Sequence, residues 1–185
     1  MTTPIKEDSI VQEGDPVLRA VALPVPKKDI GSPALAKVIR KMHAALAPEK
    51  YGVAIAAPQV GESLRMFVVA GRVFKEEEDA ADGHAASGQG DREAHPLPPD
   101  RVYINPEITR ASRKKLDESE GCLSVRGLFG MVARHERVTL KYTDEKGETK
   151  TENATGLLGH IFQHEVDHLN GILFIDKARD VHASD

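Results

Sequence analysis

The stretch that decides the fold is TGLLGHIFQHEVDHLNG, residues 155–171. It predicts a single helix that begins at about Thr155, and Gly171 stands where a helix commonly ends on a left-handed residue. Burial of the helix is indicated by four apolar side chains within it: Leu158, Ile161, Phe162 and Leu169. A buried helix near the end of the chain needs earlier elements packed around it, so the rest of the sequence must supply those layers.

The same helix carries the pattern H-E-x-x-H at residues 164–168. His164 and His168 are four residues apart, so both lie on one helix face and can reach one metal ion. Glu165 lies one step around the helix, which suits a general base acting on a water molecule beside the metal. The alternative is a pair of surface histidines. The apolar flanks argue against it, because burying such groups without partners is costly.

A catalytic metal site of this kind needs a third protein ligand, and the downstream chain offers none of the usual ones. Residues 169–185 contain no glutamate, and Phe174 stands where an H-E-x-x-H-x-x-G-x-x-H pattern requires histidine. His182 remains, but we expect it in a frayed tail. The simplest metalloprotease arrangements therefore lack a ligand.

His160 continues the i, i+4 series but cannot share the ion with His168. The two residues are about 12 Å apart along the helix axis, whereas two ligands of a tetrahedral ion are only about 3–4 Å apart. His160 is therefore expected either to line the pocket beside the metal or to be a partly buried helix residue.

The single cysteine, Cys122, lies upstream in ESEGCLSV. A buried structural cysteine is the ordinary alternative, yet a thiolate is one of few remaining ligands for a site with two histidines. One cysteine cannot form an internal disulfide, which indicates a reducing cytoplasm.

Composition limits the function further. The 185 residues are 40% hydrophobic with a net charge of −4, and the pI is about 6.1. These values argue against a nucleic-acid-binding protein. No apolar run is long enough to span a bilayer, and no secretory signal is visible. The length is that of one catalytic domain over residues 1–185.

Other segments predict the remaining elements. Residues 32–46 predict a helix that Ser32 caps and Pro33 begins. Strands are predicted for residues 64–74 and 101–109, and residues 131–154 predict two strands joined by a turn at DEKG. The fold class is therefore α+β, with the late helix packed on antiparallel sheet.

Residues 75–100 have a different character. They are acidic, rich in glycine and alanine and without periodicity, so we expect an inserted mobile surface loop. His84 and His95 lie in it, and solvated loop histidines are expected rather than metal ligands. The sequence assigns this insert no role.

Three separate stretches resemble the peptide deformylase family. GVAIAAPQVG (residues 52–61) resembles its G-x-G-Φ-A-A-x-Q motif, in which Φ is apolar. EGCLS (residues 120–124) and QHEVDHLNG (residues 163–171) resemble its two other motifs. The order and spacing agree, and the resemblance covers nearly the whole chain apart from residues 75–100 and the tail.

The resemblance implies an α+β fold in which antiparallel sheets are packed around a central metal-binding C-terminal helix. It also implies a metal-dependent, bacterial-type cytoplasmic enzyme that removes the formyl group from N-formylmethionine of nascent polypeptides, and hence transient proximity to the ribosome. It places the family's metal ligands on Cys122, His164 and His168 and its catalytic glutamate on Glu165. One divalent ion per chain is implied, Fe²⁺ natively, with Zn²⁺, Ni²⁺ or Co²⁺ as substitutes.

The resemblance also assigns the groups around the substrate. The Gln59 side chain and the Leu123 backbone N–H would stabilise the oxyanion. The positions that would contact the peptide are, for its backbone, Val53, Ala54 and Gly121 and, for its first side chain, Val53, Glu120, Leu157, His160 and Ile161.

The sequence departs from the family at two positions near these groups. Ala54 replaces the second glycine of the first motif, and its neighbours predict extended backbone there. Arg126 follows EGCLSV where many members have proline. We also expect Asp167 to pair with Arg134, which would tie the cysteine strand to the helix; a solvated Asp167 is the alternative.

Two other functions remain as alternatives. A zinc metallopeptidase would need a different third ligand. A non-catalytic metal- or peptide-binding module retaining the fold would be favoured by loss of Glu165 or Gln59, and both are present. A closed structural metal site would need a fourth protein ligand, for which the sequence has no obvious candidate.

Overall fold

The computed structural model describes residues 10–75 and 97–183. Within these residues, two longer helices and eight strands follow one another: α1 (Pro33–Leu46), β1 (Ala54–Ala56), β2 (Met66–Val69), β3 (Arg101–Ala111), β4 (Lys115–Cys122), β5 (Val125–His135), β6 (Arg137–Thr143), β7 (Thr149–Thr155), α3 (Gly156–Leu169) and β8 (Arg179–Ala183). No helix among the described residues is both long enough and apolar enough to cross a bilayer.

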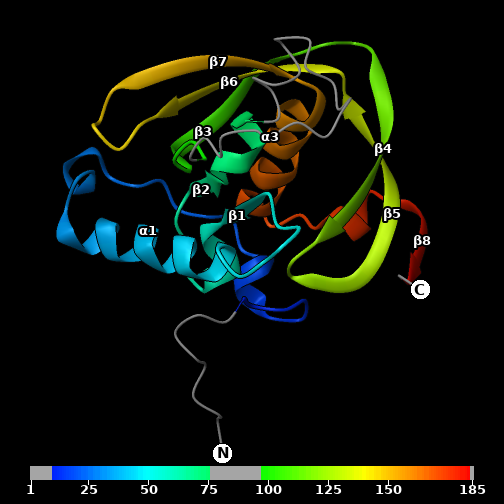
Figure 1. Ribbon diagram of the computed structural model, residues 1–185, viewed down its shortest axis with the longest axis horizontal. Helices are drawn as coiled ribbons and strands as arrows, with labels where there is room; N and C mark the ends of the chain where they lie inside the picture. Colours follow the sequence, from blue (N-terminus) through cyan, green and yellow to red (C-terminus); the bar gives the residue numbers. More distant parts are fainter. Residues whose placement is uncertain (1–9, 76–96, 184–185) are drawn as a thin grey trace, which may run out of the picture.

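The strands form two antiparallel sheets, in the orders β1-β2-β3-β6-β7 and β4-β5-β8. Helix α3 lies between them, with β6 and β7 on one side and β4 and β5 on the other (Figure 1). The α+β class and the central C-terminal helix predicted from the sequence are confirmed. β1 and β4 are edge strands, each paired with one neighbour among the described residues, so each presents an open edge.

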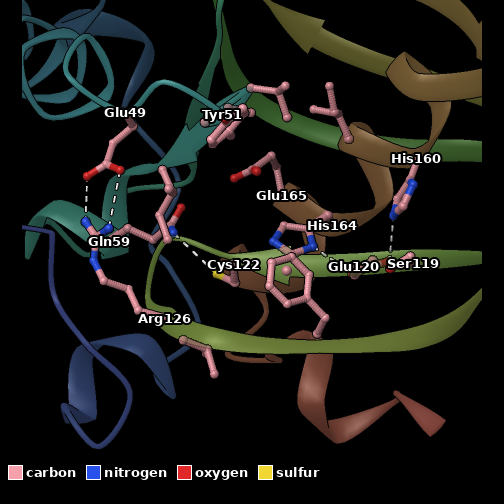
Figure 2. A pocket seen from close by; sticks show the side chains of 18 of the residues that line it. Glu49, Tyr51, Gln59, Ser119, Glu120, Cys122, Arg126, His160, His164 and Glu165 are labelled. Atoms are coloured by element: carbon pink, nitrogen blue, oxygen red, sulfur yellow. Dashed lines mark hydrogen bonds and ion pairs between the residues drawn. The ribbon is translucent and has the colours of Figure 1, made fainter. Parts of the chain in front are cut away.

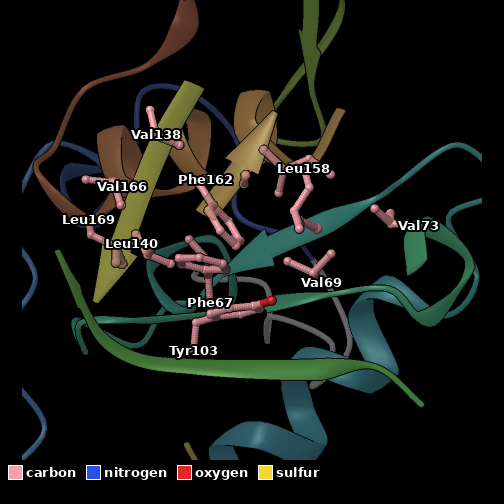
Figure 3. Packing of buried hydrophobic residues seen from close by; sticks show 14 of the residues in the cluster. Phe67, Val69, Val73, Tyr103, Val138, Leu140, Leu158, Phe162, Val166 and Leu169 are labelled. Atoms are coloured by element: carbon pink, nitrogen blue, oxygen red, sulfur yellow. The ribbon is translucent and has the colours of Figure 1, made fainter. Parts of the chain in front are cut away.

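The main core packs α3 onto the five-stranded sheet. Phe162 of α3 is fully buried and meets the Tyr103 ring of β3 edge-on, with ring centroids 5.1 Å apart, and Tyr103 stacks on Phe67 of β2 at 4.8 Å (Figure 3). Aromatic pairs at these separations add to the gain from burial alone. The helix that carries the H-E-x-x-H pattern is thereby fixed on its apolar side.

The start of α1 and the end of α3 lie where the capping residues of the sequence predicted them. Ser32 Oγ accepts a hydrogen bond from the Leu35 N–H at 3.2 Å, as the predicted cap requires. After α3, Gly171 has φ +74°, and a Cβ there would stand 2.4 Å from the carbonyl oxygen of Arg19. Only glycine fits this position, because it needs both a left-handed backbone and close approach of another segment.

Two predictions about the extent of strands, and one about the position of His182, were wrong. The strand expected over residues 64–74 ends at Val69, and residues 71–75 are helical. Residues 131–154 contain the end of β5 as well as β6 and β7, because the chain turns at His135–Arg137 without glycine or proline. His182 does not lie in a frayed tail: it belongs to β8, which pairs with β5.

The expected insert falls almost wholly outside the described residues, since 76–96 are not described, and His84 and His95 lie in that part. Ala54 lies in β1, paired with Val69, so the expectation of extended backbone at Ala54 is confirmed. The two sheets thus leave their open edges, β1 and β4, on either side of α3.

Candidate metal centre and active site

Helix α3 presents His164 and His168 side by side, with ring centroids 5.0 Å apart. His168 is 1% exposed, and the His164 side chain is 14% exposed. The apolar face of the helix is held by the core, so its polar face is directed at the second sheet, where β4 ends.

Cys122 is the last residue of β4, and its Sγ lies 3.2 Å from Nε2 of His168. The ligand atoms of Cys122, His164 and His168 lie within 4.8 Å of one another, and no fourth such group joins them within residues 10–75 and 97–183. One sulfur and two imidazole nitrogens at this spacing fit a divalent transition metal such as zinc or iron. With three protein ligands, a fourth position stays open for chemistry.

Glu120, two residues before Cys122, holds His164 in place. Its Oε2 accepts a hydrogen bond from Nδ1 of His164 at 2.7 Å, and its Oε1 accepts one from Nε2 of His160 at 2.8 Å. Because Nδ1 of His164 is engaged, Nε2 is the nitrogen left for a metal, which is the usual arrangement around a histidine ligand.

Arg134 of β5 completes this support. Its guanidinium donates to both oxygens of Glu120, at 2.5 and 3.0 Å, and to Asp167 Oδ2 at 2.6 Å. Burial alone would raise the pKa of Glu120, but the hydrogen bonds from His160, His164 and Arg134 hold that pKa well below its ordinary value. The expected pairing of Asp167 with Arg134 is confirmed, and Lys177 also binds Asp167.

Replacing Arg134 by methionine is expected to lower the free energy of unfolding by about 3–5 kcal/mol, because the Glu120 and Asp167 carboxylates would stay buried without their partner. Urea unfolding with metal present measures this change. Arg110→Met, at an exposed position of β3, is the control and should change the free energy of unfolding by less than about 0.5 kcal/mol. Equal stability of the two variants would contradict a central role for the network.

A cavity of about 760 Å³ opens beside these groups, and its lining residues come from both sheets and from α3 (Figure 2). One wall is formed by residues 48–54, the other by residues 118–129, and α3 forms the base. The cavity is lined by every position to which the resemblance gave contact with the peptide or the oxyanion, namely Val53, Ala54, Gln59, Glu120, Gly121, Leu123, Leu157, His160 and Ile161, and also by Cys122, His164 and Glu165. His168 lies behind this surface.

Glu165 faces the cavity although it is only 4% exposed. Its Oε2 is buried without a hydrogen-bond partner among the described residues. Burial raises the pKa of Glu165 to about 7, against a smaller lowering by His164. A buried carboxyl group with an unpaired oxygen, next to a cluster of metal ligands, fits a proton acceptor whose partner arrives with the substrate.

Gln59 is held in a fixed orientation in the short 3-10 helix that follows β1. Its Oε1 accepts a hydrogen bond from the Ala56 N–H at 2.8 Å, and its Nε2 donates to Ser124 Oγ at 3.1 Å. Nε2 is also 3.6 Å from Cys122 Sγ. An amide nitrogen has two hydrogens: one is donated to Ser124, and the other is donated over a long distance to the sulfur, from which a ligand oxygen could take it over.

The family model for polypeptide deformylase matches residues 7–184. The chain belongs to the polypeptide deformylase family. Deformylases are metallohydrolases that remove the formyl group from the N-terminal methionine of nascent polypeptides. The comparisons therefore do not support the two alternatives, a zinc metallopeptidase and a non-catalytic binding module.

Individual deformylases agree along nearly their whole length. The peptide deformylase of Dictyoglomus thermophilum is 42% identical over 166 residues, which are 89% of this chain and 88% of that one. That of Flavobacterium psychrophilum is 35% identical, over 91% of this chain and 80% of its own length. The crystal structure of the Thermotoga maritima peptide deformylase superimposes with a TM-score of 0.72 at 35% identity, over 92% of this chain and 96% of that one.

Two residues that support the deformylase site were missed in the sequence. Ser124 is fully buried and receives the Gln59 amide, and its N–H points at Cys122 Sγ at 3.4 Å. Gln12 Nε2 donates to the Leu123 carbonyl at 3.1 Å. Ser124 stood within the quoted EGCLS stretch without an assigned role, whereas no local pattern connects Gln12 with a residue 111 positions away.

Proposed function

We propose that Cys122, His164 and His168 hold one divalent metal ion, Fe²⁺ in the native protein, at the centre of a deformylase active site. The donor set supports this assignment, because one thiolate with two imidazoles suits both iron and zinc. A bound divalent metal would supply Lewis-acid chemistry and lower the pKa of a water molecule in contact with it to about 7.

Glu165 is the proposed proton carrier. It accepts a proton from the water that attacks the formyl carbon, and it passes that proton to the amine nitrogen when the formyl C–N bond breaks. The Gln59 amide and the Leu123 N–H would donate hydrogen bonds to the formyl oxygen as it gains negative charge. Such donors are typically worth about 10²–10³-fold in kcat each.

The peptide would bind as an extra strand between the open edges of β1 and β4. Val53, Ala54 and Gly121 line this space from the two walls, and pairing with their backbone would let the main chain of any sequence be recognised. The methionine side chain would enter the part of the cavity next to His160 and Ile161. In support, a related deformylase of Acinetobacter baumannii, with a TM-score of 0.73 and 35% identity, was crystallised with Met-Ala-Ser bound.

The observation that carries the proposal is the position of Glu165. It lines the cavity beside Cys122 and His164, with His168 behind them, and one of its carboxylate oxygens has no partner among the described residues. The test is anaerobic purification, metal analysis and measurement of formate released from formyl-Met peptides. We expect about one metal ion per chain and release from formyl-Met but not acetyl-Met peptides. Metal-loaded protein that releases no formate would refute the proposal.

The loaded metal should determine how long activity lasts in air. Ferrous iron with a thiolate ligand and an open coordination position is exposed to O₂, so iron-loaded enzyme is expected to lose activity over time, while nickel- or zinc-loaded enzyme keeps it. Formate release is measured at intervals after exposure to air, with parallel anaerobic samples as controls. Decay at the same rate for all three metals would count against iron oxidation as the cause.

The proposed substrate indicates where in the cell the protein acts. Formylated chains emerge from ribosomes, so we place the protein in the cytoplasm with transient proximity to the ribosome. The chain would act as a single catalytic domain, in which residues 75–100 form an insert.

A further inference from the structure

Two charged side chains meet across the cavity at the end away from His160. Glu49 lies in the segment between α1 and β1, and Arg126 lies just after the turn that joins β4 to β5. Arg126 Nη2 donates to Glu49 Oε1 at 2.5 Å and Nη1 donates to Oε2 at 3.3 Å, so the guanidinium binds both carboxylate oxygens (Figure 2). We call these two residues the cross-cleft ion pair.

The cross-cleft ion pair joins the two walls that would bind the peptide. Glu49 belongs to the wall that continues into Val53 and β1, and Arg126 belongs to the wall that includes Gly121 and Leu123.

Packing beneath the ion pair brings the same walls together. A Cβ on Gly52 would stand 2.9 Å from Glu49 Cβ and 3.1 Å from Leu123 Cδ1, so only glycine allows this approach. Arg72 Nη2 also donates a hydrogen bond to the Glu49 backbone carbonyl at 3.0 Å, which fixes the backbone at Glu49. Arg126 therefore pairs with an anchored partner.

We infer that the cross-cleft ion pair sets the separation of the two open strand edges and thereby tunes the affinity for the peptide. The inference rests on the proposed function, because it concerns how tightly the peptide substrate binds in the same cavity. Neither side chain hydrogen-bonds Glu165, Gln59 or the three metal ligands among the contacts of the described residues. Glu49 and Arg126 are therefore positioning residues, and their loss should raise KM and leave kcat nearly unchanged.

The exposure of the pair makes this effect sensitive to salt. The Arg126 side chain is 53% exposed and that of Glu49 is 22% exposed. Exposed ion pairs contribute modestly and are screened as the Debye length falls from about 10 Å at 0.1 M salt to about 3 Å at 1 M. The wild-type KM should therefore rise with salt.

The test is a double-mutant cycle with Glu49→Gln, Arg126→Gln and the double variant, assayed on uncharged formyl-Met-Ala-amide so that salt acts on the enzyme alone. Each single change is expected to raise KM about two- to fivefold, with kcat within about twofold. The double variant should be no worse than either single variant, because both remove one interaction. Its KM should not respond to salt.

The control is Lys114→Gln, which breaks a comparable pair, Lys114–Glu136 at 2.5 Å, outside the cavity. It should leave KM unchanged. Melting temperature and metal content are measured for every variant, so that unfolding is separated from an effect on affinity. Additive effects in the cycle, a fall in kcat with unchanged KM, or equal salt dependence of wild type and double variant would each overturn the inference.

Calorimetric binding of acetyl-Met-Ala-amide separates this inference from the proposed function. If the wild-type protein binds this peptide but releases no formate from the formyl form, the proposed function fails, while the affinities of the variants still test the ion pair. Binding that weakens about two- to fivefold in the single variants supports the inference. Binding equal in all variants, or absent from the wild type, overturns it.

Discussion

Replacing Glu165 by glutamine will leave the metal in place and slow formate release by about 10²–10⁴-fold, the range typical of a lost general acid–base. Glutamine has the size and shape of glutamate, so the packing around this 4% exposed side chain is kept. An amide cannot take a proton from the attacking water, and that is the step assigned to Glu165.

Two measurements decide this prediction: metal per chain by elemental analysis, and kcat on a formyl-Met peptide. Glu62→Gln is the matched control, since Glu62 is half-buried, pairs with Lys41 and lies outside the cavity; its kcat should stay within about twofold, as for ordinary surface changes. A Glu165→Gln protein that folds but has lost its metal would show that Glu165 is a ligand instead. Unchanged kcat would show that another group carries the proton.

The sequence was most informative where function and packing share one local pattern. Helix α3 combines an apolar stripe with a polar face at a spacing of four residues, so its burial and the pairing of His164 with His168 follow from helix geometry. The predicted contact between Arg134 and Asp167 is also confirmed, at 2.6 Å, because Asp167 lies within the H-E-x-x-H motif and Arg134 lies on β5, next to the strand that ends at Cys122.

Other structural features could not be predicted, because no short stretch of the sequence indicates them. Strand β8 is exposed along its whole length, so it lacks the alternation by which a half-buried strand is recognised. The helical turn at residues 71–75 contains Val73 and Phe74, which continue the apolar pattern of the strand beyond its end at Val69. The interaction of Glu120 with His164 spans 44 residues, and it arises only because β4 runs past α3. The resemblance placed Glu120 beside the methionine side chain, and Glu120 does line the cavity, but no local pattern indicated that its carboxylate would also bind His160, His164 and Arg134.

The second large effect is expected at Cys122. Replacing Cys122 by serine removes the thiolate and leaves a hydroxyl group that stays protonated near neutral pH. Loss of a residue that merely supports a ligand already costs about 10–100-fold in metal affinity, so loss of a ligand should cost at least about 100-fold. Formate release should fall in parallel, since the remaining two histidines hold the ion weakly.

Metal-dependent stability tests this without relying on activity. At a free metal concentration of 100 times the wild-type Kd, binding stabilises the fold by about 2.7 kcal/mol, and a 100-fold weaker site retains only about 0.4 kcal/mol. Added metal should therefore raise the melting temperature of the wild type and hardly change that of Cys122→Ser.

His160→Asn is the control for this experiment, because His160 lies on the same helix and touches Glu120 but does not belong to the ligand cluster. It should keep nearly the full metal-induced shift, whereas His164→Asn should lose the shift as Cys122→Ser does. A full shift in Cys122→Ser would remove the sulfur from the ligand set. The metal would then rest on the two histidines and a ligand from elsewhere in the chain, and the role given to the end of β4 would have to be abandoned.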